Sequence, residues 1–274
     1  MNTQGYSEDR NMEQEIRSLL QTRRAGCEIR YFCTIDSTNR YAGRIAEEGA
    51  PDGTLVIADE QTAGRGRSGR QWVTPPKEAI SFSLILRPVL PPEKISMVTL
   101  VMGLAVAKAL NGLYGLKGGI KWPNDIVLNG KKLCGILTEM SAESGKVNHI
   151  VIGVGINANL TSFPEEIVST ATSLKLELGH GINRAELIAE VMKEFELLYD
   201  VFEETGSLAD MKDSYNRFCV NRNCPVRVLD PGGGYTGTAR GIDDGGVLLV
   251  ELDDGTIRRV SSGEVSVRGI YGYV

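Results

Sequence analysis

The sequence predicts an α/β or α+β layered domain followed by a small five-stranded β-barrel. Apolar strands and amphipathic helices alternate between residues 28 and 140, as is typical of a sheet covered by helices. After residue 218 the pattern changes to short strands separated by Asp-Gly and Gly-Gly turns, which indicates a small barrel. We therefore expect an N-terminal extension over residues 1–26, a larger domain over residues 27–220 and the barrel over residues 221–274.

The N-terminal extension holds one weak helical pattern. Met12, Ile16, Leu19 and Leu20 recur at helical spacing among charged residues, and Gly26 then breaks the pattern. One helix is too little for a winged helix-turn-helix, so we expect this extension to carry no DNA-reading module.

The elements of the two domains follow from the hydrophobic periodicity of each segment. In the larger domain, strands are expected over residues 29–32, 55–59, 79–86, 126–128, 135–140 and 148–154. Helices are expected over residues 39–48, 95–110 and 184–204. In the last of these helices apolar residues recur at steps of three and four, so we expect it to cover a face of the sheet. The barrel strands are expected over residues 225–229, 235–240, 247–252, 256–260 and 264–268.

Composition and charge exclude several classes of protein. Thirty Lys and Arg residues stand against 35 Asp and Glu residues, which gives a net charge of −5 and disfavours a general nucleic-acid binder. A hydrophobic fraction of 42% with a mean hydropathy of −0.12 excludes global disorder.

Neither a membrane span nor a secretory signal is expected. The most apolar run, residues 98–107, is interrupted by Thr99 and Gly103 and is shorter than the roughly 18 residues of a membrane span. The polar and acidic residues 1–11 do not resemble a secretory signal. These features predict a cytoplasmic protein.

Cysteine and histidine usage argues against a zinc site and against a nucleophilic triad. The chain has five cysteines, an odd number, with no C-x-x-C pair, and its histidines are His149 and His180 alone. Cys219 and Cys224 enclose four residues, but no second half of a zinc site is evident. We expect reduced thiols and no serine or cysteine triad.

One basic stretch contrasts with the acidic chain. Residues 63–77, AGRGRSGRQWVTPPK, carry Arg65, Arg67, Arg70 and Lys77 without any acidic residue. Glycines alternate with these arginines, so the backbone can approach a ligand closely while the guanidinium groups donate to a carboxylate or a phosphate. The stretch lacks the Lys-Ser/Thr ending of a P-loop and the spacing of a dinucleotide fingerprint. It is predicted to wrap an anion, and the alternative is a solvated basic loop.

A second candidate segment is residues 121–139, KWPNDIVLNGKKLCGILTE. A Trp-Pro dipeptide ends the preceding strand and fixes a turn that carries Asn124 and Asp125, while Asn129-Gly130 forms a hairpin turn. The hairpin returns Lys132 towards the same end, so two lysines and an aspartate are predicted to converge. Taken alone, this pattern is also compatible with a purely structural turn.

A third candidate segment is residues 150–159, IVIGVGINAN. It reads as an apolar strand that runs into Gly155 and Asn157, where an exposed amide is predicted to contact the edge of a base. Taken alone, the segment is more typical of a buried strand with a capping asparagine.

Together these segments closely resemble the biotin protein ligase family. The resemblance extends from residue 27 to the C-terminus and rests on Ser37-Thr38-Asn39, the run from Gln61 to Trp72, Lys121-Trp122-Pro123-Asn124-Asp125, the run from Lys132 to Leu137, and Gly155-Ile156-Asn157. It implies a mixed-sheet α/β (α+β) catalytic domain followed by a small C-terminal SH3-like β-barrel. The DNA-binding winged helix of the bifunctional repressor ligases has no counterpart in this sequence, so the resemblance implies an enzyme without repressor function.

The resemblance also implies the reaction, which is a two-step acyl transfer. Biotin, the substrate, reacts with ATP and Mg²⁺ to give biotinyl-5′-AMP and pyrophosphate, and a lysine of a biotin carboxyl carrier protein or domain then attacks the mixed anhydride. No DNA or membrane partner is expected. The identity of the carrier, the number of Mg²⁺ ions and the presence of a homodimer stay open.

The resemblance assigns residues to three overlapping sets. The set implied for biotin is Ser37, Thr38, Asn39, Gln61, Arg65, Gly66, Arg67, Lys132 and Gly135. The set implied for ATP and the adenylate is Arg65, Arg67, Arg70, Trp72, Lys121, Asn124 and Asn157. The set implied for catalysis is Lys132, Arg67 and Asp125. Within it, Asp125 would orient Mg²⁺ or the incoming amine.

Two other functions stay open at this stage. A lipoate or octanoate protein ligase of the same superfamily would use similar chemistry, but its acyl pocket does not need the polar set Ser37, Thr38 and Gln61 to contact a ureido ring. A biotin-sensing transcriptional regulator would need a DNA-reading module, for which residues 1–26 are too few.

Overall fold

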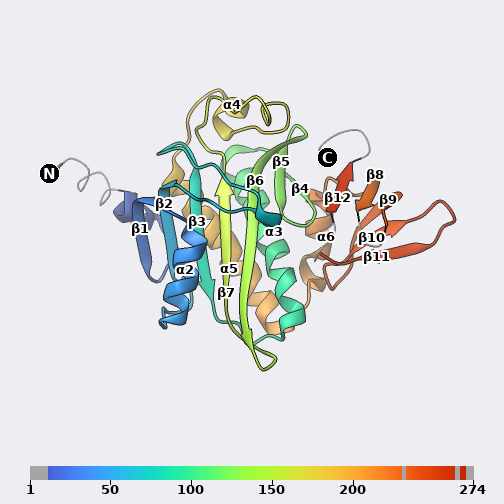
Figure 1. The fold of residues 1–274 in the computed structure, drawn as a ribbon, viewed down its shortest axis with the longest axis horizontal. Helices are drawn as coiled ribbons and strands as arrows, with labels where there is room; N and C mark the ends of the chain where they lie inside the picture. Colours follow the sequence, from blue (N-terminus) through green and yellow to red (C-terminus); the bar gives the residue numbers. More distant parts are fainter. Residues whose placement is uncertain (1–11, 230–232, 263–265, 270–274) are drawn as a thin grey trace.

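The computed structural model describes residues 12–229, 233–262 and 266–269 (Figure 1). The larger part of the chain is built on a seven-stranded sheet and the C-terminal part on a five-stranded sheet. The predicted fold class, an α/β domain with a small β domain at its C-terminal side, is confirmed. Residues 1–11 of the predicted extension and residues 264–265 of the last predicted strand lie outside the described residues.

The large sheet is mixed. Its strands are β1 (Ile29–Ile35), β2 (Leu55–Gln61), β3 (Ile80–Leu86), β4 (Gly119–Lys121), β5 (Asp125–Leu128), β6 (Lys131–Glu143) and β7 (Lys146–Ile156). They lie in the order β1-β2-β3-β7-β6-β5-β4. The β1 and β2 pair is parallel, and the other pairs are antiparallel. The sequence did not predict β4, because three residues give no periodic signal.

Helices lie on both faces of this sheet. They are α2 (Thr38–Glu47), α3 (Ile95–Tyr114), α4 (Leu174–Leu178), α5 (Arg184–Thr205) and α6 (Ala209–Phe218), and residues 12–19 form a further helix. The predicted helices at the N-terminus and at α2, α3 and α5 are confirmed. The unpredicted helices α4 and α6 are short, and α6 buries only Met211 and Tyr215.

The two faces of the sheet are covered unequally. Figure 1 shows α3 and α5 behind the sheet and α2 in front of it. The rear helices bury the main hydrophobic core, whereas α2 buries a small cluster that includes Ala42, Val56 and Val151. Helix α2 packs mainly on β2, β3 and β7 and reaches β6 through the side chain of Asn39. The rest of the front of β6 is left to the segment that joins β2 to β3.

Helix α3 is the central element of the main core. By length and composition the stretch Pro92–Tyr114 is long and apolar enough to cross a membrane, but 72% of its apolar window is buried inside the protein. This apolar stretch is longer than the run of residues 98–107 that the sequence suggested, because Thr99 and Gly103 interrupt the run without ending the helix. Its burial is that of the core helix of a globular domain.

The C-terminal sheet is antiparallel throughout. Its strands are β8 (Pro225–Leu229), β9 (Tyr235–Ile242), β10 (Leu248–Glu251), β11 (Ile257–Val260) and β12 (Ser266–Gly269), in the order β11-β10-β9-β8-β12. Each of the five predicted strands is present. Strands β11 and β12 are the edges of this sheet.

The C-terminal domain is held against the turn between β4 and β5. Trp122 in this turn is fully buried, and its indole Nε1 donates to the carbonyl of Gly246 at 3.1 Å. The backbone N–H of Trp122 donates to Asn221 Oδ1 at 2.8 Å. The turn that carries Asn124 and Asp125 is therefore tied directly to the C-terminal domain.

A buried carboxylate anchors the N-terminal segment to α5. The side chain of Glu196 accepts hydrogen bonds from the backbone N–H groups of Arg23 (2.7 Å), Arg24 (2.7 Å) and Ala25 (2.9 Å). Burial opposes ionisation, but these three bonds and the charge of Arg23 outweigh it and hold the pKa of Glu196 below its usual value. The bonds fix the segment that brings Ile16 into the main core.

We expect Glu196→Gln to lower the free energy of unfolding at pH 7 by about 1 to 3 kcal/mol, because the new amide nitrogen faces backbone N–H donors. The depressed pKa means that the ionised group stabilises the fold above its unfolded pKa, near 4.5, and that this contribution is lost as the pH falls through the folded pKa. Urea unfolding at pH 7 and pH 4 measures both effects. Glu190→Gln on the same helix removes only a surface pair with Lys193, and an equal loss in both variants would contradict the anchoring role.

Candidate active site

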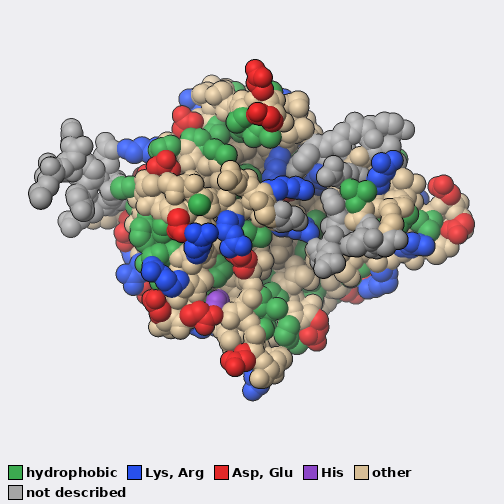
Figure 2. All heavy atoms as spheres, viewed as in Figure 1, with side chains coloured by type: hydrophobic (Ala, Val, Ile, Leu, Met, Phe, Trp, Pro, Cys, Tyr) green, Lys and Arg blue, Asp and Glu red, His purple; other side chains and the backbone are tan. Residues whose placement is uncertain are grey.

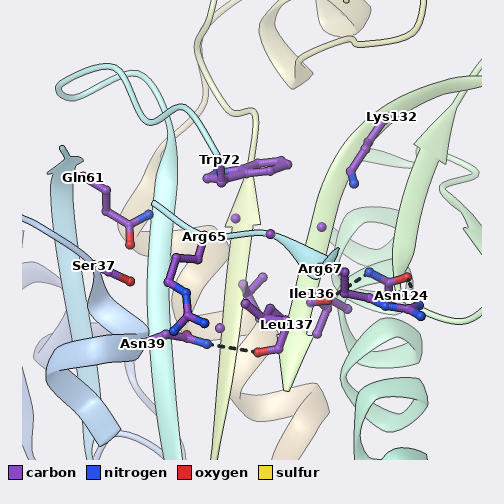
Figure 3. A pocket seen from close by; sticks show the side chains of 15 residues that line it. Ser37, Asn39, Gln61, Arg65, Arg67, Trp72, Asn124, Lys132, Ile136 and Leu137 are labelled. Atoms are coloured by element: carbon purple, nitrogen blue, oxygen red, sulfur yellow. Dashed lines mark hydrogen bonds between the residues drawn. The ribbon is translucent and has the colours of Figure 1, made fainter. Parts of the chain in front are cut away.

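A cleft opens on the front face of the sheet, beneath the segment that joins β2 to β3 (Figure 3). Ten of the residues expected at the site line it, namely Ser37, Asn39, Gln61, Arg65, Gly66, Arg67, Trp72, Asn124, Lys132 and Gly135. The expected residues that do not line it are Thr38, Arg70, Lys121, Asp125 and Asn157. The structure thus brings together side chains that are separated by about a hundred positions in the sequence.

Glycines form the floor of the cleft. Gly135 in β6 lies opposite Gly155 in β7, and Gly153 lies opposite Leu137. A Cβ atom added at Gly155 would lie 2.3 Å from the ring of Trp72, and one added at Gly153 would lie 2.0 Å from Asn39 Oδ1. Real Cβ atoms do not approach other atoms so closely, so Trp72 and Asn39 can occupy this space only above glycines.

The wall of the cleft nearest to α2 is a network of hydroxyl and amide groups. Ser37 caps the N-terminus of α2, where its side chain accepts from the backbone N–H of Arg40. The backbone N–H and the hydroxyl of Thr38 donate to Gln61 Oε1 at 2.9 and 3.1 Å, and Gln61 Nε2 donates to Thr74 at 3.2 Å. Thr38 therefore lies behind the cleft, where it holds Gln61 in position.

The Gly-Arg segment points two of its arginines into the cleft and one away from it. Arg65 forms an ion pair with Glu139, with Nη1 and Oε1 3.0 Å apart. Arg67 donates to Asn124 Oδ1 at 3.0 Å and to the carbonyl of Ser262, in the C-terminal domain, at 3.4 Å. Arg70 is exposed. Arg70 does not line the cleft, and its carbonyl closes the turn with Gly66 N–H; its predicted contact with ATP stays a prediction.

The charge of the cleft is positive in a protein whose net charge is negative. In Figure 2, Lys and Arg side chains gather near the middle of this face and at its junction with the C-terminal part. Burial is the main effect that lowers the pKa of Arg67, opposed by the charge of Asp125, although an arginine stays protonated in proteins. The cleft therefore offers fixed cations to an anionic ligand.

Lys132 and Asp125 meet at the far side of the cleft. The Asn129-Gly130 turn joins β5 to β6, and Lys132 Nζ lies 2.7 Å from Asp125 Oδ1. The ammonium group also lies 5.6 Å from the centre of the Trp72 ring, within the range of a cation–π contact. The predicted convergence of Lys132 and Asp125 is confirmed. Lys121, the second lysine of the prediction, is buried and lies opposite Asp125 in the β4 and β5 pair, and it does not line the cleft.

Comparison with known proteins agrees with this site. Residues 31–157 match the Biotin/lipoate A/B protein ligase family, and residues 223–268 match the Biotin protein ligase C terminal domain. The bifunctional ligase/repressor BirA of Bacillus spizizenii is 40% identical over 257 residues, which cover 93% of this chain and 78% of that protein. The chain belongs to the biotin protein ligase family.

Two further relatives place the chain within the biotin protein ligase family. The biotin acetyl-CoA-carboxylase ligase of Mycobacterium tuberculosis is 35% identical over 236 residues, covering 84% of this chain and 85% of that protein. The structure of the biotin protein ligase of Aquifex aeolicus in complex with biotin and ATP superimposes with a TM-score of 0.78 at 31% identity, covering 89% of this chain and 99% of that chain.

The expectation of an exposed amide at Asn157 in this ligase is wrong. Asn157 does not present an exposed amide, because its side chain is buried and its Nδ2 donates to the carbonyl of Thr172 at 3.0 Å. Its backbone N–H donates to Leu133, and its carbonyl accepts from Leu174. Asn157 therefore fixes the segment between β7 and α4 against β6.

Glu139 and Ser83 are not among the residues expected at the site, although both lie in the network around the cleft. Glu139 pairs with Arg65 and also accepts from Asn39 Nδ2 at 2.8 Å. Ser83 Oγ lies 2.6 Å from Asn39 Oδ1 and 2.8 Å from Thr38 Oγ1. A signal for each exists in the sequence, because Glu139 alternates with Gly135 along one strand and Ser83 interrupts an otherwise apolar one.

We expect Gly155→Ala to displace Trp72, because the new methyl group would lie 2.3 Å from its ring. The overlap should cost roughly 1 to 3 kcal/mol of stability and shift the fluorescence of Trp72, while Trp122 stays buried between the domains. Emission spectra and thermal unfolding measure both effects. In α3, Gly112→Ala meets nothing within 4 Å and is the matched control. An unchanged spectrum for Gly155→Ala would contradict this description of the floor.

Proposed function

We propose that this chain is an ATP-dependent biotin protein ligase that activates biotin as biotinyl-5′-AMP and transfers it to a lysine of a biotin carboxyl carrier protein. The observation that carries the proposal is the cleft itself. Arg67 and Lys132 lie at one side of it, Ser37 and Gln61 lie at the other, and Arg65 reaches from the loop into the space towards Asn39. This arrangement fits a ligand with an anionic end and an amide-like ring.

The first step joins two anions, so it needs cations placed in advance. A carboxylate oxygen of biotin attacks the α-phosphorus of ATP, the bond from that phosphorus to the bridging oxygen breaks, and pyrophosphate leaves. Repulsion between the anions falls when Arg65 and Lys132 contact the carboxylate and the α-phosphate. Because both side chains are already held by carboxylates, little reorganisation is required when the ligands bind.

The other end of the cleft suits the ring of biotin. A urea carries paired donors and an acceptor, and Ser37 and Gln61 supply hydroxyl and amide groups at this wall. Trp72 supplies an apolar surface above the glycine floor. Its indole N–H is buried without a partner among the described residues, which makes it a donor for a ligand oxygen. Thr38 and Asn39 hold the wall in position.

The second step transfers the acyl group to an amine. The neutral amine of the acceptor lysine attacks the acyl carbon of the adenylate, the bond to the phosphate oxygen breaks, and AMP leaves. The adenylate must stay bound until the acceptor lysine arrives. Arg67 is placed to retain its phosphate during that time, because it joins the loop to Asn124 and to Ser262 of the C-terminal domain. The carrier substrate is suggested by the name of the M. tuberculosis relative, an acetyl-CoA-carboxylase ligase.

Mg²⁺ fits this site as a part of the substrate MgATP. No group of three His, Cys, Asp or Glu side chains that could hold a metal occurs in the described part of the chain. Mg²⁺ is usually bound by one or two carboxylates together with substrate phosphates, and Asp125 is the carboxylate beside Lys132. Asp125 would contact the ion, which neutralises phosphate charge when bound.

Two observations favour biotin over lipoate or octanoate. The family match over residues 31–157 is shared by biotin and lipoate ligases, but residues 223–268 match the domain specific to biotin protein ligases. A plain acyl chain has no polar group that Ser37, Thr38 and Gln61 could bind. We further propose that the enzyme is cytoplasmic and that it does not bind DNA. Gel-shift assays with operator-like DNA test the absence of DNA binding.

We expect Lys132→Ala to reduce biotin-dependent exchange of pyrophosphate into ATP by about 10² to 10³, the usual cost of losing one contact to developing charge. The fold should survive, because Lys132 is partly exposed in a hairpin. Lys131→Ala is the matched control, since successive side chains of a strand point to opposite faces.

Lipoate and octanoate in place of biotin should give no exchange. Wild-type protein without biotin-dependent exchange would overturn the proposed function, and an active Lys132→Ala variant would remove this lysine from it.

A further inference from the structure

Glu139 lies at the end of the glycine floor and forms contacts with two residues of the cleft. We propose that Glu139 is a positioning residue, which orients Arg65 across the cleft and fixes Asn39 beneath it. The proposal rests on the proposed function, because it concerns how the anionic end of the substrate is held.

The position of Glu139 follows from the alternation of side chains in β6. Gly135, Leu137 and Glu139 occupy one face of this strand, and Gly135 and Leu137 line the cleft. The residue opposite Glu139 in β7 is Val151, which is buried beneath α2. The floor therefore changes at Glu139 from open glycines to a carboxylate that stands beside the N-terminus of α2.

Both oxygens of the Glu139 carboxylate are used. Oε1 lies 3.0 Å from Arg65 Nη1, and Oε2 accepts from Asn39 Nδ2 at 2.8 Å. Rotation of the carboxylate towards one partner would break its bond to the other. Since Asn39 is buried between α2 and the sheet, it fixes the carboxylate, and the carboxylate in turn fixes the more exposed partner, Arg65.

The contact leaves Arg65 able to bind a ligand. A guanidinium has five N–H donors in a rigid plane, and the bond to Glu139 occupies one terminal nitrogen. Figure 3 shows Arg65 reaching from the loop into the pocket towards Asn39. The remaining donors can therefore contact a carboxylate or phosphate while the ion pair persists, which distinguishes positioning from blocking.

Glu139 is also connected to the wall of the cleft nearest to α2. Asn39 Oδ1 lies 2.6 Å from Ser83 Oγ, which lies 2.8 Å from Thr38 Oγ1, and Thr38 donates to Gln61. This chain of hydrogen bonds runs beneath the cleft from Arg65 to Gln61. Loss of the charge at Glu139 is therefore expected to weaken binding of biotin more than binding of ATP.

The experiment compares Glu139→Gln, Arg65→Gln and the double variant in biotin-dependent pyrophosphate exchange. Glu139→Gln keeps the size of the side chain and an acceptor for Asn39 but removes the charge that holds Arg65. The matched control is Glu251→Gln, since Glu251 and Arg240 form an ion pair of similar exposure in the C-terminal sheet, with 35% of the Glu251 side chain and 42% of the Arg240 side chain accessible.

We expect Glu139→Gln to raise the KM for biotin roughly fivefold, which is the upper range for a partly exposed ion pair, with a smaller change in the KM for ATP. The difference from wild type should shrink at 1 M salt, because the effect is electrostatic. The double variant should resemble Arg65→Gln alone. Glu139→Asp, which keeps the charge, should recover part of the loss.

Three outcomes would overturn the inference: a KM for biotin in Glu139→Gln equal to that of Glu251→Gln, a defect that does not change with salt, or effects of the two substitutions that simply add. Thermal unfolding of each variant separates these outcomes from loss of the fold. Wild-type protein that shows neither exchange nor a biotin-dependent rise in its unfolding midpoint would instead overturn the proposed function.

Discussion

The cleft depends on the absence of side chains from the middle of a sheet. At Gly135, Gly153 and Gly155 the front of β6 and β7 carries no side chains. The backbone hydrogen bonds of two long strands keep the floor rigid despite the conformational freedom of glycine. Trp72 and Asn39 then enter the space from loops and from α2, and the remaining volume is available to a ligand. A methyl group at either β7 glycine would remove that arrangement.

The cations of the cleft are arranged so that each has a fixed partner. Arg65 is held by Glu139, Lys132 by Asp125, and Arg67 by the amide of Asn124. Such pairs contribute little to stability when they are partly exposed, so their effect is mainly geometric. They hold long side chains in place before a ligand arrives, which lowers the entropy lost on binding. The turn with Asn124 and Asp125 is itself held by Trp122, so docking of the C-terminal domain and the geometry of the cleft depend on the same turn.

The sequence predicted the fold class, most of the long elements and the segments that meet at the cleft. Periodicity served well for α5, which is long and buries a stripe, and α3 was predicted from a long apolar run that is buried on nearly all sides. It failed for β4 and α4, which are too short to repeat a pattern. The roles of single side chains were harder to predict, since they depend on where a side chain points. Asn157 donates its amide to Thr172 rather than facing solvent, and Arg70 lies outside the cleft because the turn at Gly66 closes on its carbonyl.

The network under the cleft explains why the family motifs extend beyond residues that can touch a ligand. Thr38 does not line the cleft, yet it holds Gln61, and Ser83 lies within reach of both Thr38 and Asn39. A buried amide or hydroxyl without a partner costs more than a hydrogen bond supplies, so each member needs the next one. The network ends at Glu139, whose charge is compensated by Arg65 at the surface of the cleft. The polar wall of the cleft is thus stable only when all of its hydrogen bonds are formed together. Arg65, which faces the ligand, also compensates the last charge of this network.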